Sequence, residues 1–197
     1  MKDFFIMLLG VLRLRPVDTA EAVEIGPIGL MGPMAAPEVL PGIDARSLRN
    51  IRTLDVKFQE QVMKFLLEAK KIAAMTGCDY VVISGTRTWA QQDALYAQGR
   101  TKPGRVVTKA RAGQSNHNFG IAFDCGVFRG GAYLDDQNPR VASSVHRACS
   151  EAARKHGLAW GGNWKFKDEP HYQLASVPAT PTEQMRVTYK AKGSVVA

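Results

Sequence analysis

Hydrophobic residues recur at helical spacing between positions 58 and 73. The positions that repeat every three or four residues are Phe58, Val62, Phe65, Leu66, Ala69, Ile72 and Ala73. Spacing of this kind places one apolar stripe along a helix, and that stripe packs against a core. Gly77 follows and supplies a stop signal. The pattern therefore predicts an amphipathic helix that ends before Gly77.

Two more helices are indicated by the residues that begin them. Thr88 and Gln91 have the spacing of a capping box, in which each side chain satisfies a backbone N–H of the first turn. Asn138 and Pro139 are typical of the first positions of a helix, and the apolar residues that follow share one face. By that periodicity His146 lies on the outer side of the helix, and we interpret it as a structural residue.

Three short apolar runs predict strands. They are residues 80–84 (YVVIS), 121–128 (IAFDCGVF) and 171–175 (HYQLA). Helices and strands are mixed along the chain without strict alternation, and no segment repeats. This order of elements predicts an α+β fold.

The two ends of the chain differ from its middle in composition. Residues 1–43 are apolar and rich in Pro and Gly, residues 44–178 hold the predicted elements, and residues 179–197 form a basic C-terminal tail. The apolar run Phe4–Leu12 is far shorter than the roughly 20 residues that a membrane-spanning helix needs, so we predict no stable span. The run is either an export signal or a short packed segment. Positive charge at Arg13 follows it, whereas a signal carries its charge before the run.

The net charge of +8 is unevenly distributed along the chain. Residues 1–45 carry 3 Lys or Arg and 6 Asp or Glu, whereas residues 46–197 carry 23 and 12. The main body is therefore strongly basic and attracts polyanions, which include nucleic acid, anionic lipid and an anionic cell wall. The chain lacks the basic and aromatic pattern on which nucleic-acid bases stack, so we predict no nucleic-acid partner.

The three cysteines, Cys78, Cys125 and Cys149, are far apart and form no CxxC pair. An odd number at this spacing argues against a disulfide framework and against a thiolate zinc site. We predict that all three are buried free thiols, as is usual for cysteine.

His117 and Asp124 stand seven residues apart in the stretch SNHNFGIAFD. On one straight strand an odd separation points two side chains to opposite faces. Gly120 lies between them and is placed to supply a turn that lets both face one point. Asp124 is set within an apolar strand, where an unpaired carboxylate is unfavourable. It is therefore either paired with an arginine or backbone donors, or bound to a metal ion.

Asp168 and His171 precede the last predicted strand in WGGNWKFKDEPH. Pro170 disfavours helix before it, which indicates a loop that enters the strand. Two neutral imidazoles and one carboxylate make a typical three-ligand catalytic zinc site with one position left for water. Zinc lowers the pKa of such a water to about 7. A neighbouring carboxylate can take the proton and pass it to a leaving amine.

The sequence resembles the peptidoglycan L-alanyl-D-glutamate endopeptidases of the zinc D-Ala-D-Ala metallopeptidase family, common among phage endolysins and bacterial wall hydrolases. The stretches that carry the resemblance are SGTRTWAQQDALYAQGRTKPG (84–104), SNHNFGIAFD (115–124) and WGGNWKFKDEPH (160–171). The order Ser-x-His-x6-Asp followed by Asp-x-x-His is specific to that family. The resemblance runs from about Asp44 to Leu174 and implies a small antiparallel sheet that carries the zinc site, flanked by helices.

The resemblance also implies a role for each motif residue. The zinc ligands would be His117, Asp124 and His171. Asp168 would be the catalytic acid and base. Arg87 would face the scissile carbonyl, where a fixed guanidinium stabilises developing negative charge. Ser115 would lie near the site, either with a catalytic role or only bonded to the local backbone.

We predict a zinc-dependent endopeptidase that hydrolyses the peptidoglycan stem peptide at the L-Ala-D-Glu bond, in wall lysis or remodelling. The alternatives are a zinc D,D-carboxypeptidase that acts on D-Ala-D-Ala and a non-catalytic zinc-containing binding module. A proton acceptor at Asp168 argues against the binding module. The basic body fits the polyanionic wall as a partner. We expect a monomer, made in the cytoplasm, that acts on the wall in the periplasm or outside the cell, with its export route left open.

Overall fold

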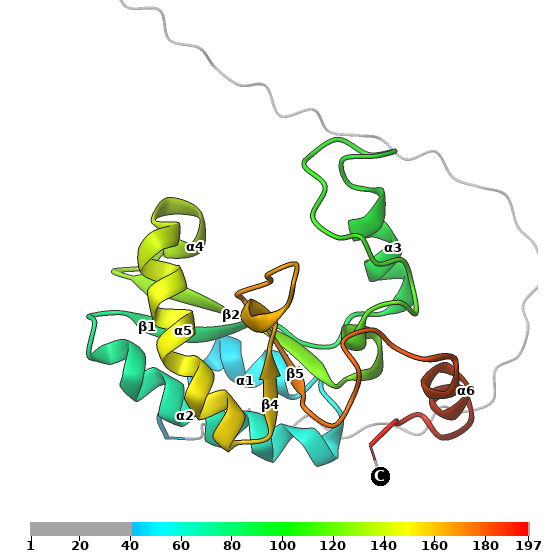
Figure 1. The fold of residues 1–197 in the computed structure, drawn as a ribbon, viewed down its shortest axis with the longest axis horizontal. Helices are drawn as coiled ribbons and strands as arrows, with labels where there is room; N and C mark the ends of the chain where they lie inside the picture. Colours follow the sequence, from blue (N-terminus) through cyan, green and yellow to red (C-terminus); the bar gives the residue numbers. More distant parts are fainter. Residues whose placement is uncertain (1–40, 197) are drawn as a thin grey trace, which may run out of the picture. The chain divides into compact units, whose positions relative to one another are not determined.

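The computed structural model describes residues 41–196 and gives them an α+β fold, as predicted (Figure 1). The helices are α1 (Ala45–Ile51), α2 (Val56–Ala74), α3 (Trp89–Ala97), α4 (Leu134–Gln137), α5 (Pro139–Lys155) and α6 (Glu183–Lys192). The 3₁₀ turns are η1 (Asn116–Phe119) and η2 (Gly161–Asn163). The strands are β1 (Asp79–Ser84), β2 (Ala122–Arg129), β3 (Ala132–Tyr133), β4 (Leu158–Trp160) and β5 (His171–Leu174). The predicted helices correspond to α2, α3 and α5, and the predicted strands to β1, β2 and β5.

The strands form one antiparallel sheet in the order β1-β2-β5-β4, and the short β3 pairs with β2. The register between β2 and β5 pairs Ala122 with Gln173, Phe123 with Tyr172 and Asp124 with His171. Side chains alternate between the two faces of a strand. The polar residues of β5 therefore share one face with Asp124, and the aromatic residues share the other.

The aromatic face of the sheet packs against α2 and α5 and forms the core (Figure 1). Phe65 of α2 is fully buried, with ring centroids 6.4, 5.9 and 4.9 Å from those of Tyr80, Phe123 and Tyr172. Phe123 and Tyr172 are stacked across the two strands at 5.6 Å. Large aromatic side chains contribute most of the packing energy in such a cluster. The three cysteines are buried and free, as predicted.

Helix α1 covers the open edge of β1. Ser47 Oγ accepts a hydrogen bond from Val82 N at 2.9 Å, and Asn50 Nδ2 donates to Val82 O at 2.7 Å. These two bonds replace those of a neighbouring strand, which an edge strand otherwise lacks. Asp44 begins the helix by accepting from Ser47 N at 2.8 Å.

The prediction that His146 lies on the outer side of α5 is wrong, because its side chain is fully buried. Residues three and four positions apart share one helix face, so His146 lies on the same stripe as Val145 and Cys149. Its Nδ1 is 2.6 Å from Tyr80 Oη, and its Nε2 is 2.7 Å from Asp135 Oδ1. The imidazole is stable in the core because both ring nitrogens are hydrogen-bonded.

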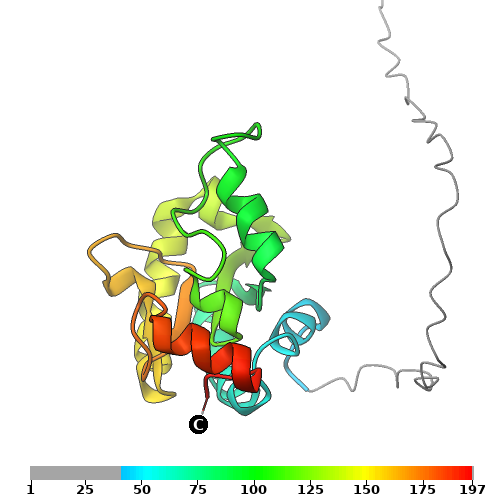
Figure 2. The same ribbon diagram turned by 90° about the vertical axis from the view of Figure 1, so that its right-hand side faces the viewer.

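The segment after β5, predicted as a basic tail, contains helix α6 (Figure 2). Tyr189 packs edge-on against Phe119 of η1 with a centroid distance of 5.2 Å. Arg186 Nη1 donates to Gly113 O at 3.1 Å. The C-terminal helix is therefore packed against η1 and the loop that leads into it.

Residues 1–40, with the apolar run Phe4–Leu12, lie outside the described residues. The division of the chain at residues 43 and 178 stays a prediction. Within residues 41–196, none of the helices combines the length and the apolar character that crossing a membrane requires.

Candidate metal centre

Asp124 and His171 face each other across the ladder between β2 and β5. His171 Nδ1 lies 3.4 Å from Asp124 Oδ1, and the two side chains are only 8% and 15% exposed. Directly opposite residues of a ladder are held at a separation that the strand spacing sets. Two candidate ligands are thus brought together by the backbone of the sheet.

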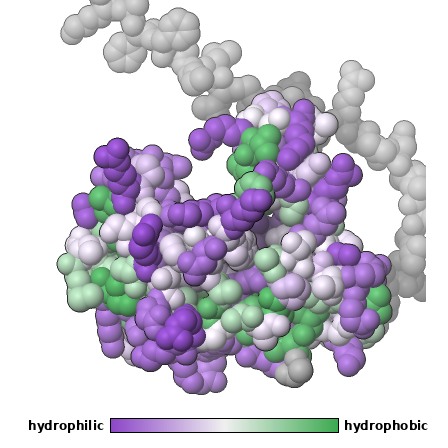
Figure 3. All heavy atoms as spheres, in the orientation of Figure 1, coloured by the Kyte–Doolittle hydropathy of each residue, from purple (hydrophilic) through white to green (hydrophobic). Residues whose placement is uncertain are grey.

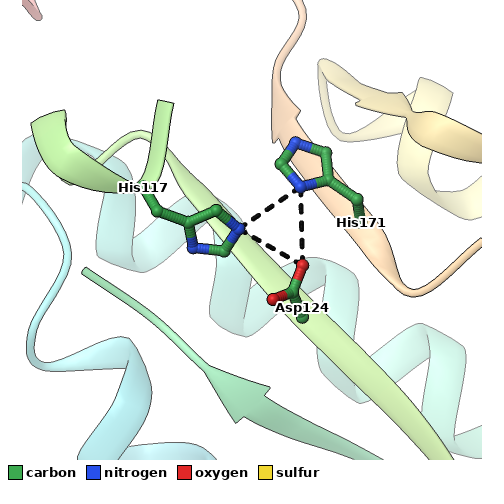
Figure 4. Close-up of side chains that lie close together, drawn as sticks. All are labelled: His117, Asp124 and His171. Atoms are coloured by element: carbon green, nitrogen blue, oxygen red, sulfur yellow. Dashed lines mark hydrogen bonds and ion pairs between the residues drawn. The ribbon is translucent and has the colours of Figure 1, made fainter. Parts of the chain in front are cut away.

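His117 reaches the same point from η1 (Figure 4). Its Nε2 lies 3.2 Å from Asp124 Oδ1 and 3.3 Å from His171 Nδ1. The chain turns between the two motif residues at Gly120, where φ is +70°, a region that favours glycine. A Cβ at Gly120 would also lie 2.8 Å from Asp55 N. The predicted turn at Gly120 is confirmed.

The ring nitrogens that point away from this convergence are hydrogen-bonded as well. His117 Nδ1 lies 2.8 Å from Gly85 O, which can only accept, so Nδ1 carries the proton and Nε2 presents its lone pair. His171 Nε2 lies 3.2 Å from Gln173 Oε1, and its Nδ1 faces inward. Metal-binding histidines in proteins are oriented by outer hydrogen bonds of this kind.

The three inward atoms form a donor set that fits a divalent metal ion. The ligand atoms of His117, Asp124 and His171 all lie within 4.8 Å of one another. Two imidazoles and a carboxylate are the ligands of a catalytic zinc site. Burial lowers the pKa of His171, but the hydrogen bond and the charge of Asp124 outweigh it and raise that pKa above its ordinary value. A metal ion therefore competes with a proton at His171 when the pH is low.

Arg87 is bonded to the carboxylate oxygen of Asp124 that does not face the imidazoles. Its Nη2 donates to Asp124 Oδ2 and, at 3.1 Å, to Ser84 Oγ. Burial by itself would raise the pKa of Asp124, but His117, His171 and Arg87 together lower it well below its ordinary value. The carboxylate is therefore ionised, with Oδ2 on the guanidinium and Oδ1 turned toward the imidazoles.

Asp168 lies on the loop between η2 and β5, as predicted. Its N donates to Gly161 O, and its O accepts from His171 N, both at 3.1 Å. Gly161 permits this close approach, since a Cβ there would meet Asp168 O at 2.5 Å. The carboxylate reaches solvent, yet the protein around it and the charge of Asp124 raise its pKa above the ordinary value. A carboxyl with a raised pKa is better matched to proton transfer near neutral pH.

All predicted site residues line one cavity of about 440 Å³, and they are Arg87, Ser115, His117, Asp124, Asp168 and His171. The surface is hollowed between the regions of α3 and α4, with hydrophilic side chains along much of its border and a hydrophobic patch on the side of α3 (Figure 3). Ser115 precedes η1 without a capping bond from its side chain. Trp164 also lines the cavity, with its ring centroid 4.9 Å from that of His171.

Two residues beside the ligands, Asn116 and Gln173, were not predicted from the sequence. They are 2% and 1% exposed, and Asn116 Nδ2 donates to Gln173 Oε1 at 2.9 Å. The alternation of a strand places Gln173 on the same face as His171. A buried polar side chain between Tyr172 and Leu174 needs a partner. That requirement marks Gln173 in the sequence as a residue with a hydrogen-bond partner, but it does not name the partner.

We compared the chain first with models of protein families. Residues 108–174 match the family model described as D-alanyl-D-alanine carboxypeptidase. This stretch holds the three candidate ligands and Asp168. The match agrees with the resemblance predicted from the sequence, and it shows that residues 108–174 are similar to this class of peptidases.

Within that class, the chain is similar to the peptidoglycan L-alanyl-D-glutamate endopeptidase CwlK of Bacillus subtilis (strain 168). The two are 41% identical over 110 residues, which cover 53% of this chain and 66% of that protein. The aligned part thus spans just under two thirds of the relative.

Two solved structures are also similar to this chain. The L-Ala D-Glu endopeptidase ChiX of Serratia marcescens is 24% identical at a TM-score of 0.42, covering 66% of this chain and 86% of that one. A mutant of the vancomycin resistance D,D-pentapeptidase VanY, in complex with Zn(II), is 14% identical at a TM-score of 0.43, covering 72% and 80%.

Proposed function

We propose that this protein is a zinc-dependent endopeptidase that hydrolyses the stem peptide of peptidoglycan at the L-Ala-D-Glu bond, in wall lysis or remodelling. The observation that carries the proposal is the convergence of two imidazoles and one carboxylate at one cavity, with Asp168 and Arg87 beside them. The 41% identity to an L-alanyl-D-glutamate endopeptidase supports the choice of bond.

The metal ion would be held by His117 Nε2, Asp124 Oδ1 and His171 Nδ1. The hydrogen bonds to the outer ring nitrogens and to Asp124 Oδ2 support this set, because they leave one lone pair of each ligand directed inward. Zinc, when bound, lowers the pKa of a water molecule and polarises a carbonyl group.

The remaining residues would move a proton and bind charge. Asp168 would take a proton from the attacking water at its carboxylate and deliver it to the leaving amine, and its raised pKa suits both transfers. Arg87 Nη1 has no hydrogen-bond partner among residues 41–196, so it is available to the oxygen of the scissile carbonyl. Ser115 would contact the substrate at the cavity wall.

A zinc D,D-carboxypeptidase is the second candidate, because the matching family model carries that description. The same residues would serve both reactions. The two differ in the bond that is cut and therefore in the fragment that is released, so the products separate them. In either case we propose that the protein acts at the cell wall, with peptidoglycan as its partner.

Metal analysis and a product map of digested walls test the proposal together. We expect about one zinc per chain and stem fragments with a new N-terminal D-Glu. His117→Ala should lose the zinc, whereas Asp136→Asn, at an exposed carboxylate on α4, should keep both zinc and products. Release of free D-Ala supports the carboxypeptidase instead. A protein that binds zinc but yields no fragment is a binding module, and absence of zinc overturns the metal site.

A further inference from the structure

Gln173 is buried behind His171, and both ends of its side-chain amide are hydrogen-bonded. Nε2 donates to Pro178 O at 3.1 Å and to Val177 O at 3.4 Å. Carbonyl oxygens can only accept, so the NH₂ end of the amide must face them. Oε1 is therefore directed at His171 Nε2, 3.2 Å away.

The orientation of Gln173 determines where His171 carries its proton. An amide oxygen has no proton to donate, so His171 Nε2 must be the donor of this bond. The neutral ring then has no proton on Nδ1, the nitrogen that lies 3.3 Å from His117 Nε2 and 3.4 Å from Asp124 Oδ1. The segment after β5 thus acts on the candidate metal site through one amide.

Asn116 connects the same amide to the turn that carries His117. Its Nδ2 donates to Gln173 Oε1 and to Pro178 O, both at 2.9 Å. Asn116 directly precedes His117 in the chain, and Gln173 follows His171 by two residues on β5. The elements of two ligands are therefore joined by one buried hydrogen bond, and Pro178 O accepts from both amides.

We propose that Asn116 and Gln173 are positioning residues, which fix the tautomer and orientation of His171 for metal binding, and that the carbonyls of residues 177–178 lock them in place. The inference rests on the metal site of the proposed function. Outer-shell partners of this kind typically contribute about 10- to 100-fold to metal affinity.

Zinc affinity, measured by competition with a chelator, gives the first test. Gln173→Met replaces the amide by an apolar side chain of similar size and so removes the acceptor, and we expect about 10- to 100-fold weaker binding than in the wild type. Asn116→Ala added to that variant should weaken binding little further, because Asn116 acts through Gln173. The control is Gln61→Met on α2, which removes a glutamine hydrogen bond to His156 O at a position that does not line the metal-site cavity. This variant should leave zinc affinity within about twofold of the wild type.

The tautomer of His171 gives the second test, which begins with the wild-type protein. Long-range ¹H–¹⁵N NMR of the zinc-free wild type at alkaline pH should show the His171 proton on Nε2, and Gln173→Met should shift part of the population to Nδ1. A proton on Nδ1 in the wild type overturns the inference, as does unchanged zinc affinity in Gln173→Met. Absence of zinc binding in the wild type would instead overturn the proposed function.

Discussion

At the scale of single residues, the cavity holds two carboxylates whose environments shift their pKa values in opposite directions. Asp124 is bonded to Arg87 and faces two imidazoles, so its pKa lies well below the ordinary value. The protein around Asp168 removes water from its carboxylate and so raises its pKa, and the negative charge of Asp124 raises that pKa further. Two carboxyl groups whose pKa values are shifted in opposite directions take different roles. Asp124 is suited to permanent charge and Asp168 to proton transfer.

Asp168→Asn should therefore keep zinc and lose turnover. We expect kcat on a stem peptide to fall by about 10²- to 10⁴-fold, the usual contribution of a positioned acid or base. In the wild type, kcat/KM should fall as the pH drops through the pKa of Asp168, because the protonated carboxyl cannot accept a proton. That decline should lie at a higher pH than the ordinary aspartate value of about 3.9.

Zinc content and the pH profile of kcat/KM check this prediction. The matched control is Asp136→Asn, at an exposed carboxylate that does not line the metal-site cavity, and it should leave both unchanged. Wild-type turnover in Asp168→Asn, or loss of its zinc, would show that Asp168 has a different role.

The sequence predicted the candidate ligands of this cavity better than it predicted the buried amides that are hydrogen-bonded beside them. Asp124 stands within an apolar strand, where an ionisable group is costly and therefore informative. His117 and His171 were identified by the motif spacing and by the family resemblance. Asn116 and Gln173 carry no charge, and amides in a sequence have many structural uses, so their position beside the ligands became visible only in the structure. His146 was misplaced because the apolar stripe read from the periodicity left it out, although its side chain is fully buried and Tyr80 and Asp135 satisfy its two ring nitrogens.

At the scale of elements, the stability of α1 depends on the charge of its N-cap residue, Asp44. Asp44 accepts from Ser47 N at 2.8 Å and from Ser47 Oγ at 2.6 Å, and Lys70 Nζ lies 3.3 Å away. Burial raises the pKa of Asp44, but the bonds from Ser47 and the charge of Lys70 outweigh it, so the pKa is lowered. A lowered folded-state pKa means that the carboxylate stabilises the fold above its unfolded pKa. This stability is lost as the pH falls through the folded value.

Asp44→Ala should lower the free energy of unfolding at pH 7 by about 1 kcal/mol, the usual effect of removing an N-cap. Urea unfolding of variant and wild type at pH 7 and near pH 3 measures the difference, which should shrink at the lower pH. Equal losses at both values would mean that the charge of Asp44 contributes nothing.

Elements were predictable where capping and periodicity agreed. The capping box at Thr88 and the Asn138–Pro139 start both appear as inferred. Helix α6 was missed because none of its residues is buried, so it has no apolar stripe to reveal it. Its attachment depends on single contacts such as Tyr189 on Phe119.

At the scale of the whole molecule, the net charge of +8 predicts that binding to an anionic cell wall, the proposed partner, depends on salt. Salt shortens the range of charge attraction from about 10 Å at 0.1 M to about 3 Å at 1 M. Sedimentation with purified walls should therefore show binding that weakens on the order of tenfold across this range. Cleavage of a short soluble stem peptide provides the control and should change far less. Salt-independent wall binding would mean that specific contacts, not charge, hold the protein there.

The pairing of Asp124 with His171 across two neighbouring strands has a consequence for how the protein would acquire the proposed metal ion. Main-chain hydrogen bonds already hold these two residues in place, and the turn at Gly120 directs His117 toward them. Binding of a metal ion would therefore require little rearrangement of the protein. A chelated sample should accordingly retain its shape and regain its ion without refolding, unlike zinc fingers, whose architecture collapses once the metal is withdrawn.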